Sequence, residues 1–103
     1  MSFEQWGYKF DGPYVSQATL DPKAGVYAIW CKTNYGWHII DVGQSEDVRD
    51  RCQNHDRTDC WSNNCQAGNI HYTAHYMPDS SETSRSRVEQ DIRSQSIPPC
   101  GKQ

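Results

Sequence analysis

The stretch VYAIWCKTNYGWHIIDV, residues 26–42, decides the fold. It holds two runs rich in β-branched and aromatic residues, residues 26–32 and 37–42, on either side of the segment TNYG. Asn34 and Gly36 in that segment suit a tight turn. The pattern predicts two antiparallel strands joined as a β-hairpin.

A helix is expected directly after the hairpin. Ser45 suits an N-cap, the acids that follow it favour the positive end of a helix dipole, and Val48 and Cys52 form an apolar i,i+4 pair. We expect this helix to end near His55. The polar stretch at residues 56–69 then predicts a loop anchored by Trp61.

A third strand and a second helix complete the pattern. In residues 69–76 apolar and polar side chains alternate, which predicts a strand with one apolar face. Pro78 ends that strand, and Asp79 with Glu82 resembles a capping box that starts a helix reaching about Gln95. Val88 and Ile92 would face the core. Their helix should end before the two prolines that follow.

Residues 1–24 are rich in aromatic and turn-forming residues, and we expect an irregular extension packed on the core. The whole chain, residues 1–103, is then a single domain whose motif-bearing region is residues 25–100. Its fold class is α+β: a small three-stranded antiparallel sheet flanked by helices, in the order β-β-α-β-α.

The composition argues against several classes of protein. Hydrophobic residues make up only 35%, but aromatic residues make up 12% and the formal net charge is −3, which argues against disorder. No apolar run approaches a membrane span, and the first residues lack the features of a signal peptide. We therefore expect a cytoplasmic protein whose five cysteines are reduced thiols.

The negative charge lies in one segment. Residues 41–60 carry six acids and three bases, whereas the segments on either side are balanced. Non-specific affinity for nucleic acid comes mainly from Lys and Arg that displace counterions. If DNA is the substrate, this domain alone should bind it weakly. We expect no membrane among its partners.

The motifs resemble those of the GIY-YIG nuclease domain. Gly25, Val26 and Tyr27 (GVY) open the first predicted strand, and Asp41, Val42 and Gly43 (DVG) close the second. Arg51 and His55 follow on the next helix, Glu89 lies on the last helix, and a proline-containing segment comes after it. The resemblance covers residues 25–100.

This resemblance implies metal-dependent hydrolysis of DNA phosphodiester bonds. Tyr27 would hold or deprotonate the attacking water, and Arg51 would stabilise charge on the phosphate. Glu89 would bind one Mg²⁺ or Mn²⁺, and His55 would assist proton transfer or contact the substrate. A phenol is a weak base at neutral pH, so Tyr27 would need a cation close by. A single carboxylate is sufficient for Mg²⁺, which retains several waters.

One position departs from the family pattern. The second tripeptide usually begins with Tyr, and here that residue is Asp41. An anion there would repel a substrate phosphate unless it points to solvent or binds the metal. A second reading is therefore a degenerate domain that binds nucleic acid or a partner protein without chemistry.

Each candidate also has a purely structural reading. Tyr27 could be a core aromatic, and Arg51 could pair with Asp47 on a solvated helix face. Glu89 lies four residues from both Arg85 and Arg93, which is typical of a surface ion-pair ladder. His55 could simply complement a helix dipole.

A third reading is a zinc-stabilised interaction module. Cys52, His55, Cys60 and Cys65 lie within fourteen residues and could supply four ligands. Their spacing matches no common zinc finger. Cys31 and Cys100 are interpreted as small buried apolar residues, and His71 and His75 as exposed side chains on the polar face of the third strand.

Overall fold

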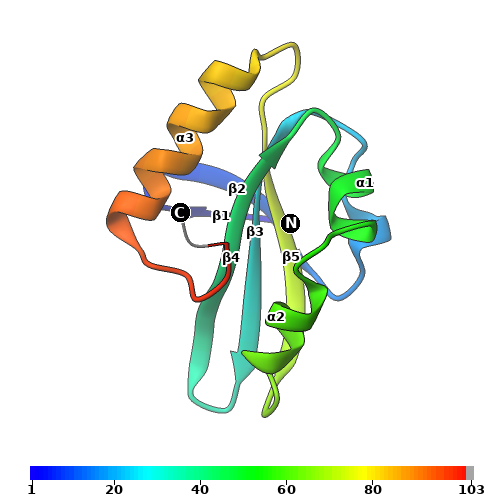
Figure 1. Cartoon of the computed structure of the whole chain (residues 1–103), viewed down its shortest axis with the longest axis vertical. Helices are drawn as coiled ribbons and strands as arrows, with labels where there is room; N and C mark the ends of the chain where they lie inside the picture. Colours follow the sequence, from blue (N-terminus) through cyan, green and yellow to red (C-terminus); the bar gives the residue numbers. More distant parts are fainter. Residues whose placement is uncertain (102–103) are drawn as a thin grey trace.

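The computed structural model describes residues 1–101 as a five-stranded antiparallel sheet with three α-helices (Figure 1). The strand order across the sheet is β1-β2-β5-β3-β4, so β4 forms one edge. The strands are β1 (Ser2–Gln5), β2 (Tyr8–Tyr14), β3 (Gly25–Thr33), β4 (Gly36–Ser45) and β5 (Asn69–Tyr76). The helices are α1 (Val48–Gln53), α2 (Thr58–Asn63) and α3 (Glu82–Gln95), with a short 3-10 turn, η1 (Gln17–Thr19). The α+β class is confirmed, but the expected number of three strands is wrong.

The predicted hairpin and third strand are confirmed. β3 pairs with β4 from Gly25 opposite Ser45 to Thr33 opposite Gly36, and β5 pairs along the other side of β3. β3 therefore lies between two partners. Its first seven residues are all buried, as expected for a strand covered on both faces.

The hairpin contains a bulge at Ile40. Ile29 lies opposite Asp41, whereas the next residue, Trp30, lies opposite Ile39, so Ile40 is an extra residue in β4. Ile40 and Asp41 consequently contact the same side of the sheet, where Trp61 lies. Without this irregularity, strict alternation would turn Asp41 to the opposite face.

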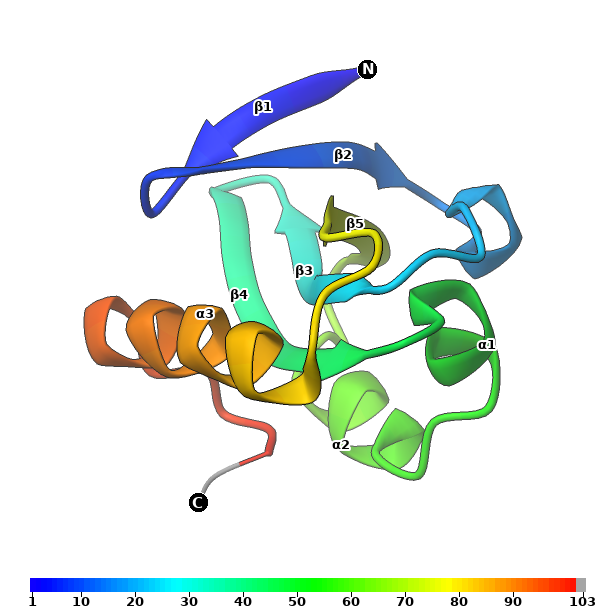
Figure 2. The same cartoon turned by 90° about the horizontal axis from the view of Figure 1, so that it is seen from above.

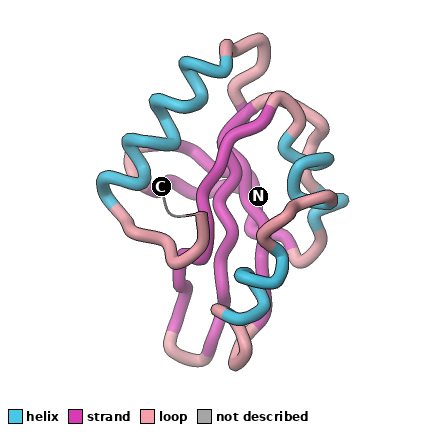
Figure 3. The backbone as a smooth tube through the Cα atoms, in the orientation of Figure 1, coloured by secondary structure: helices cyan, strands magenta, loops and turns pink. Residues whose placement is uncertain are grey.

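Residues 1–24 are not the irregular extension that we expected, because Ser2–Gln5 and Tyr8–Tyr14 within them form two strands of the sheet (Figure 3). The strands β1 and β2 are joined by Trp6 and Gly7, and both residues have positive φ, as in the two-residue turns of tight hairpins. Tryptophan is an unusual residue for such a turn. Its ring stacks on Trp30 with centroids 5.3 Å apart, so tertiary packing overrides the local preference.

The helices differ from expectation in detail. α1 begins at Val48 with Asp47 as its cap, rather than at Ser45. α2 lies inside the segment expected to be a loop, while its buried Trp61 confirms the predicted anchor. α3 is capped by Ser81 rather than Asp79. No helix within the described residues is long and apolar enough to cross a membrane.

The sheet separates two hydrophobic clusters. One lies beneath α1 and α2 and is centred on Trp61, Tyr27 and Ile29. The other contains Phe10, Trp30 and Ile92 and is covered by α3 and the β1–β2 hairpin (Figure 2). Helices therefore pack on both sides of the edge strand β4, and a polar side chain at that edge can reach both layers.

The expectation of five reduced thiols is wrong for four of the five cysteines, which form two disulfides. Cys31 pairs with Cys65, Cys60 pairs with Cys100, and Cys52 is a buried free thiol. Packing of α2 and residue 100 against the sheet brings the paired Cα atoms to 5.5 and 6.0 Å, within the range that a disulfide bridges. The partners are 34 and 40 residues apart, so sequence spacing could not identify them.

Candidate functional site

Tyr27 lies in β3 with its ring buried against β4. Its exposed fraction is 1%, and a Cβ atom added to Gly43 would lie 2.1 Å from the phenolic oxygen. Gly25 is needed for a similar reason, since its Cβ would lie 2.3 Å from the His75 carbonyl oxygen on β5. Val26 is buried on the opposite face of the sheet. The motif glycines therefore make room for the Tyr27 ring and for strand pairing.

His55 and Arg57 both form hydrogen bonds with the Tyr27 hydroxyl. The Tyr27 Oη and His55 Nε2 atoms are 2.6 Å apart, and Arg57 Nη2 donates to the same oxygen over 3.5 Å. The backbone N–H of Arg57 donates to His55 Nδ1 over 3.0 Å. Because Nδ1 accepts this bond, the neutral ring carries its proton on Nε2, which donates to Tyr27. Two donors thus point at one phenolic oxygen.

Burial determines the protonation states of this pair. Burial raises the pKa of Tyr27 above its ordinary value, although the Arg57 guanidinium opposes the shift. Burial also lowers the pKa of His55 to about 4, and the positive charges of Arg51 and Arg57 act in the same direction. At neutral pH the pair is therefore a phenol and a neutral imidazole.

Asp41 is the centre of a second, connected set of contacts. The carboxylate is fully buried and accepts from Arg57 Nε over 2.8 Å, from Trp61 Nε1 over 2.8 Å and from Arg93 Nη2 over 3.2 Å. The backbone N–H of Val42 donates to it as well. We call Asp41, Arg57, Trp61 and Arg93 the Asp41 cluster. Asp41 does not point to solvent, and two guanidinium groups compensate its charge.

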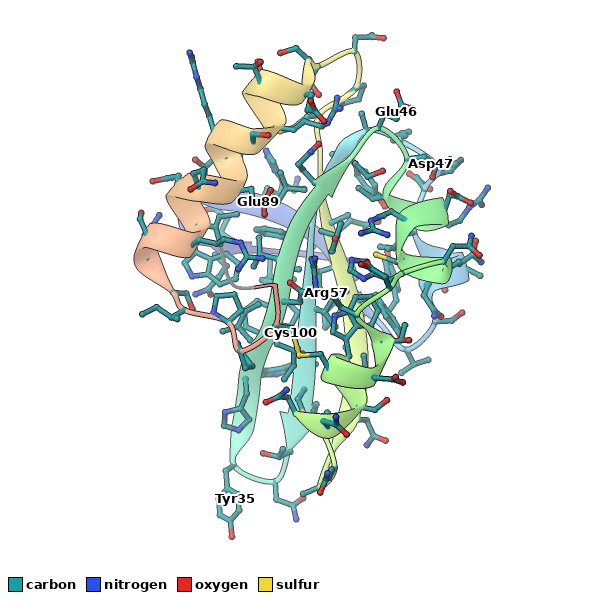
Figure 4. All side chains as sticks on the ribbon, viewed as in Figure 1. Tyr35, Glu46, Asp47, Arg57, Glu89 and Cys100 are labelled. Atoms are coloured by element: carbon teal, nitrogen blue, oxygen red, sulfur yellow. A yellow bond between two sulfur atoms is a disulfide. The ribbon has the colours of Figure 1, made fainter. Side chains whose placement is uncertain are left out.

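Glu89 reaches this cluster through Arg93. Its carboxylate accepts from Arg93 Nε over 3.2 Å, so Arg93 bridges two acids and also donates to the Val42 carbonyl of β4. Glu89 is only 9% exposed, unlike a member of a surface ladder. Arg85, the other arginine of the expected ladder, donates to Gln44 on β4. Figure 4 shows Glu89 and Arg57 on opposite sides of β4.

Arg51 lies at the rim rather than in the hydrogen-bonded cluster. It pairs with the exposed Asp56 over 2.9 Å and not with the expected Asp47, which caps α1. Arg57 takes the place beside Tyr27 that the family resemblance gives to Arg51. A signal for Arg57 existed in the sequence: an acid at position 41 between buried strand residues requires a nearby cation.

The zinc ligand set does not come together. Cys60 and Cys65 form separate disulfides and so cannot bind zinc as thiolates. Burial raises the pKa of the Cys52 thiol to about 12, which disfavours the thiolate that zinc requires. Within residues 1–101 no group of three or more His, Cys, Asp or Glu side chains is placed to hold a metal ion. The single carboxylate of Glu89 fits only a cation such as Mg²⁺ or Mn²⁺ that completes its shell with water and phosphate oxygens.

The Asp41 carboxylate is enclosed and the cluster is internally satisfied, while the Arg57 side chain stays 30% exposed. Among the described residues, every buried side-chain nitrogen and oxygen atom has a hydrogen-bond partner. An apolar cavity of about 390 Å³ lies elsewhere, bounded by Phe3, Trp30 and Trp37, and none of the candidate residues lines it. No family model, curated protein or solved structure matches the chain. Catalysis by this cluster would require a movement that admits a substrate.

Asp41→Asn should destabilise the protein severely, because it leaves two guanidinium groups without their buried carboxylate. We expect the free energy of unfolding to fall by about 3–5 kcal/mol, measured by urea denaturation. The matched control is Asp56→Asn, which removes an exposed ion pair and should leave the free energy of unfolding nearly unchanged. Equal stabilities of the two variants would contradict the central position of Asp41.

His55 should make stability pH-dependent in a defined direction. Its folded-state pKa of about 4 lies below the ordinary value of 6.5, so the unfolded chain binds the proton more tightly. The contribution of the neutral His55 to the free energy of unfolding is therefore complete above pH 6.5. It is lost as pH falls toward 4, by up to about 3 kcal/mol. The free energy of unfolding, measured by urea denaturation at a series of pH values between 7 and 4, should change less with pH in His55→Gln than in the wild type. An equal pH dependence in the two proteins would refute the lowered pKa of His55.

Proposed function

We propose that this chain is a divalent-metal-dependent nuclease of the GIY-YIG type that hydrolyses DNA phosphodiester bonds. The observation that carries the proposal is the convergence of His55 and Arg57 on the hydroxyl of Tyr27. These residues come from β3 and from the segment between α1 and α2. Glu89, on α3, is linked to them through Arg93 and Asp41.

The chemistry assigned to Tyr27 is that of a general base. Hydrogen bonds from His55 and Arg57 favour the phenolate, whereas burial favours the phenol. Entry of an additional positive charge would shift this balance toward the phenolate. A divalent cation held by Glu89 would supply such a charge and stabilise negative charge on the phosphate. Arg57 and Arg93 would then bind phosphate oxygens, which guanidinium groups recognise through paired hydrogen bonds.

His55 would position Tyr27 rather than remove its proton. Its Nδ1 atom is engaged by a backbone N–H, so its Nε2–H faces the phenolic oxygen as a donor. A neutral donor stabilises the phenolate during proton transfer and holds the ring in place. This differs from the proton-transfer role that the family resemblance implies for His55.

The second candidate is a binding module without catalysis. It is favoured by the ion pairing of Arg57 and Arg93 with Asp41, because these contacts compete with a phosphate for both guanidinium groups. Such a module would bind DNA weakly, given the acidic residues 41–60, or bind a partner protein. It would share the fold and show no cleavage under any condition.

A cytoplasmic location is part of the proposal. Disulfides in cytosolic proteins are usually transient and either catalytic or redox-sensing. A reducing cytoplasm would therefore act on the two disulfides of this structure.

The test is plasmid nicking with Mn²⁺ or Mg²⁺ at low salt, with and without a dithiol reductant. We expect Glu89→Gln and Tyr27→Phe each to reduce cleavage at least about 100-fold, the scale of a lost acid–base or charge-stabilising group. Glu82→Gln, an exposed Glu on the same helix, should cleave like the wild type. Undiminished cleavage by Tyr27→Phe and Glu89→Gln would overturn the site. No cleavage by any folded form would favour the binding module.

A further inference from the structure

Residues 98–101, which we call the closing segment, return from the end of α3 to the Asp41 cluster. Cys100 is 1% exposed, and its backbone N–H donates to the Ile40 carbonyl of β4 over 3.0 Å. Figure 4 shows Cys100 with its disulfide, which leads to Cys60 of α2. The segment therefore adds to the edge strand at the bulge that presents Asp41.

Gly101 lies directly on the charged groups of the cluster. A Cβ atom at this position would lie 2.7 Å from Arg93 Nη2, 2.8 Å from Asp41 Oδ1 and 3.0 Å from Arg57 Cζ. The φ of Gly101 is +73°, a conformation that side chains other than glycine rarely adopt. Its backbone thus occupies the space beside both guanidinium groups that a phosphate would need.

A disulfide holds the closing segment in this position. Cys100 is bonded to Cys60 of α2, and Asn64 Nδ2 lies 3.5 and 3.7 Å from the two sulfur atoms. Cys60 is partly exposed, whereas both sulfurs of the other disulfide belong to buried residues, Cys31 and Cys65. A reductant in solution therefore has readier access to Cys60 than to the disulfide in the core.

We propose that the Cys60–Cys100 disulfide is a thiol–disulfide exchange site whose reduction by a dithiol opens the Asp41 cluster to phosphate. This inference deepens the proposed function and rests on it for the identity of the phosphate-bearing substrate. One thiolate of the dithiol attacks Cys60 Sγ, breaks the S–S bond and expels the Cys100 thiolate. Its second thiolate then displaces Cys60, so the dithiol ends as a disulfide and both cysteines take up a proton.

Loss of the covalent bond should release the closing segment. Its remaining described anchors include one backbone hydrogen bond to Ile40 and the packing of Pro98 and Cys100. Removal of Gly101 would expose the contacts of Arg57 and Arg93 with Asp41. Because the Arg57 guanidinium also lies over the Tyr27 hydroxyl, movement of that side chain toward a phosphate would open Tyr27 as well.

The experiment compares the oxidised wild type with Cys60→Ser/Cys100→Ser, which mimics the reduced state without a reductant. Two readouts are used: hydrogen exchange of the backbone amide at position 100, and the affinity for a fluorescein-labelled DNA duplex in EDTA at low salt. We expect amide protection to fall at least about 10-fold and affinity to rise at least about 10-fold in the variant. Cys31→Ser/Cys65→Ser, which keeps the 60–100 bond, is the matched control and should show neither change.

The outcomes separate the two proposals. Unchanged exchange and affinity in the variant would overturn the exchange site, whatever the nuclease assay gives. Increased exchange and DNA affinity without cleavage by any form would support the exchange site and reject the nuclease. Cleavage that is equally fast in the oxidised wild type and the variant would support the nuclease and overturn control by this disulfide.

Discussion

The buried carboxylate of Asp41 is the interaction on which the rest of the structure depends. Burying an unpaired charge costs several kcal/mol, so this residue requires compensation from elsewhere in the chain. It draws Arg57 and Trp61 from the region of α2 and Arg93 from α3, which lie on opposite sides of β4. One side chain thereby fixes the two helical layers relative to the sheet edge.

The same interaction limits the chemistry of the site. Guanidinium groups that neutralise a carboxylate are also natural ligands of phosphate, so a phosphate of the proposed substrate would compete with Asp41 for Arg57 and Arg93. Closure by residues 98–101 adds a steric barrier to the electrostatic one. If the proposed function holds, the site in this structure is covered and would need a stimulus that removes the cover. The accessible disulfide at Cys60 is the element best placed to receive it.

The elements predicted well from sequence are those whose signals are local. The β3–β4 hairpin, β5 and the apolar face of α3 follow from alternation, turn residues and helical spacing, and Trp61 is the anchor that its polar surroundings suggested. Tyr27 and His55, which were both singled out from the sequence, are hydrogen-bonded to each other in the structure. Each of these depends on residues close in sequence or on one recognisable pattern.

The missed features depend on tertiary contacts. The β1–β2 turn uses a tryptophan in a conformation that only stacking on Trp30 explains. The bulge at Ile40, which turns Asp41 toward Trp61, has no local signature. The disulfides join cysteines more than thirty residues apart. The position of Asp41 between buried strand residues signals that a cation must lie nearby, but the sequence does not show that Arg57, 16 residues away, supplies it.

The most direct test of the central claim is a double-mutant cycle on Asp41→Asn and Arg93→Gln, with unfolding free energies measured by urea denaturation. If Asp41 joins α3 to β4, the two substitutions should be strongly non-additive, with a coupling energy of at least about 1.5 kcal/mol. Additivity within about 0.3 kcal/mol would show that Arg93 is held by other contacts and that Asp41 does not join α3 to β4.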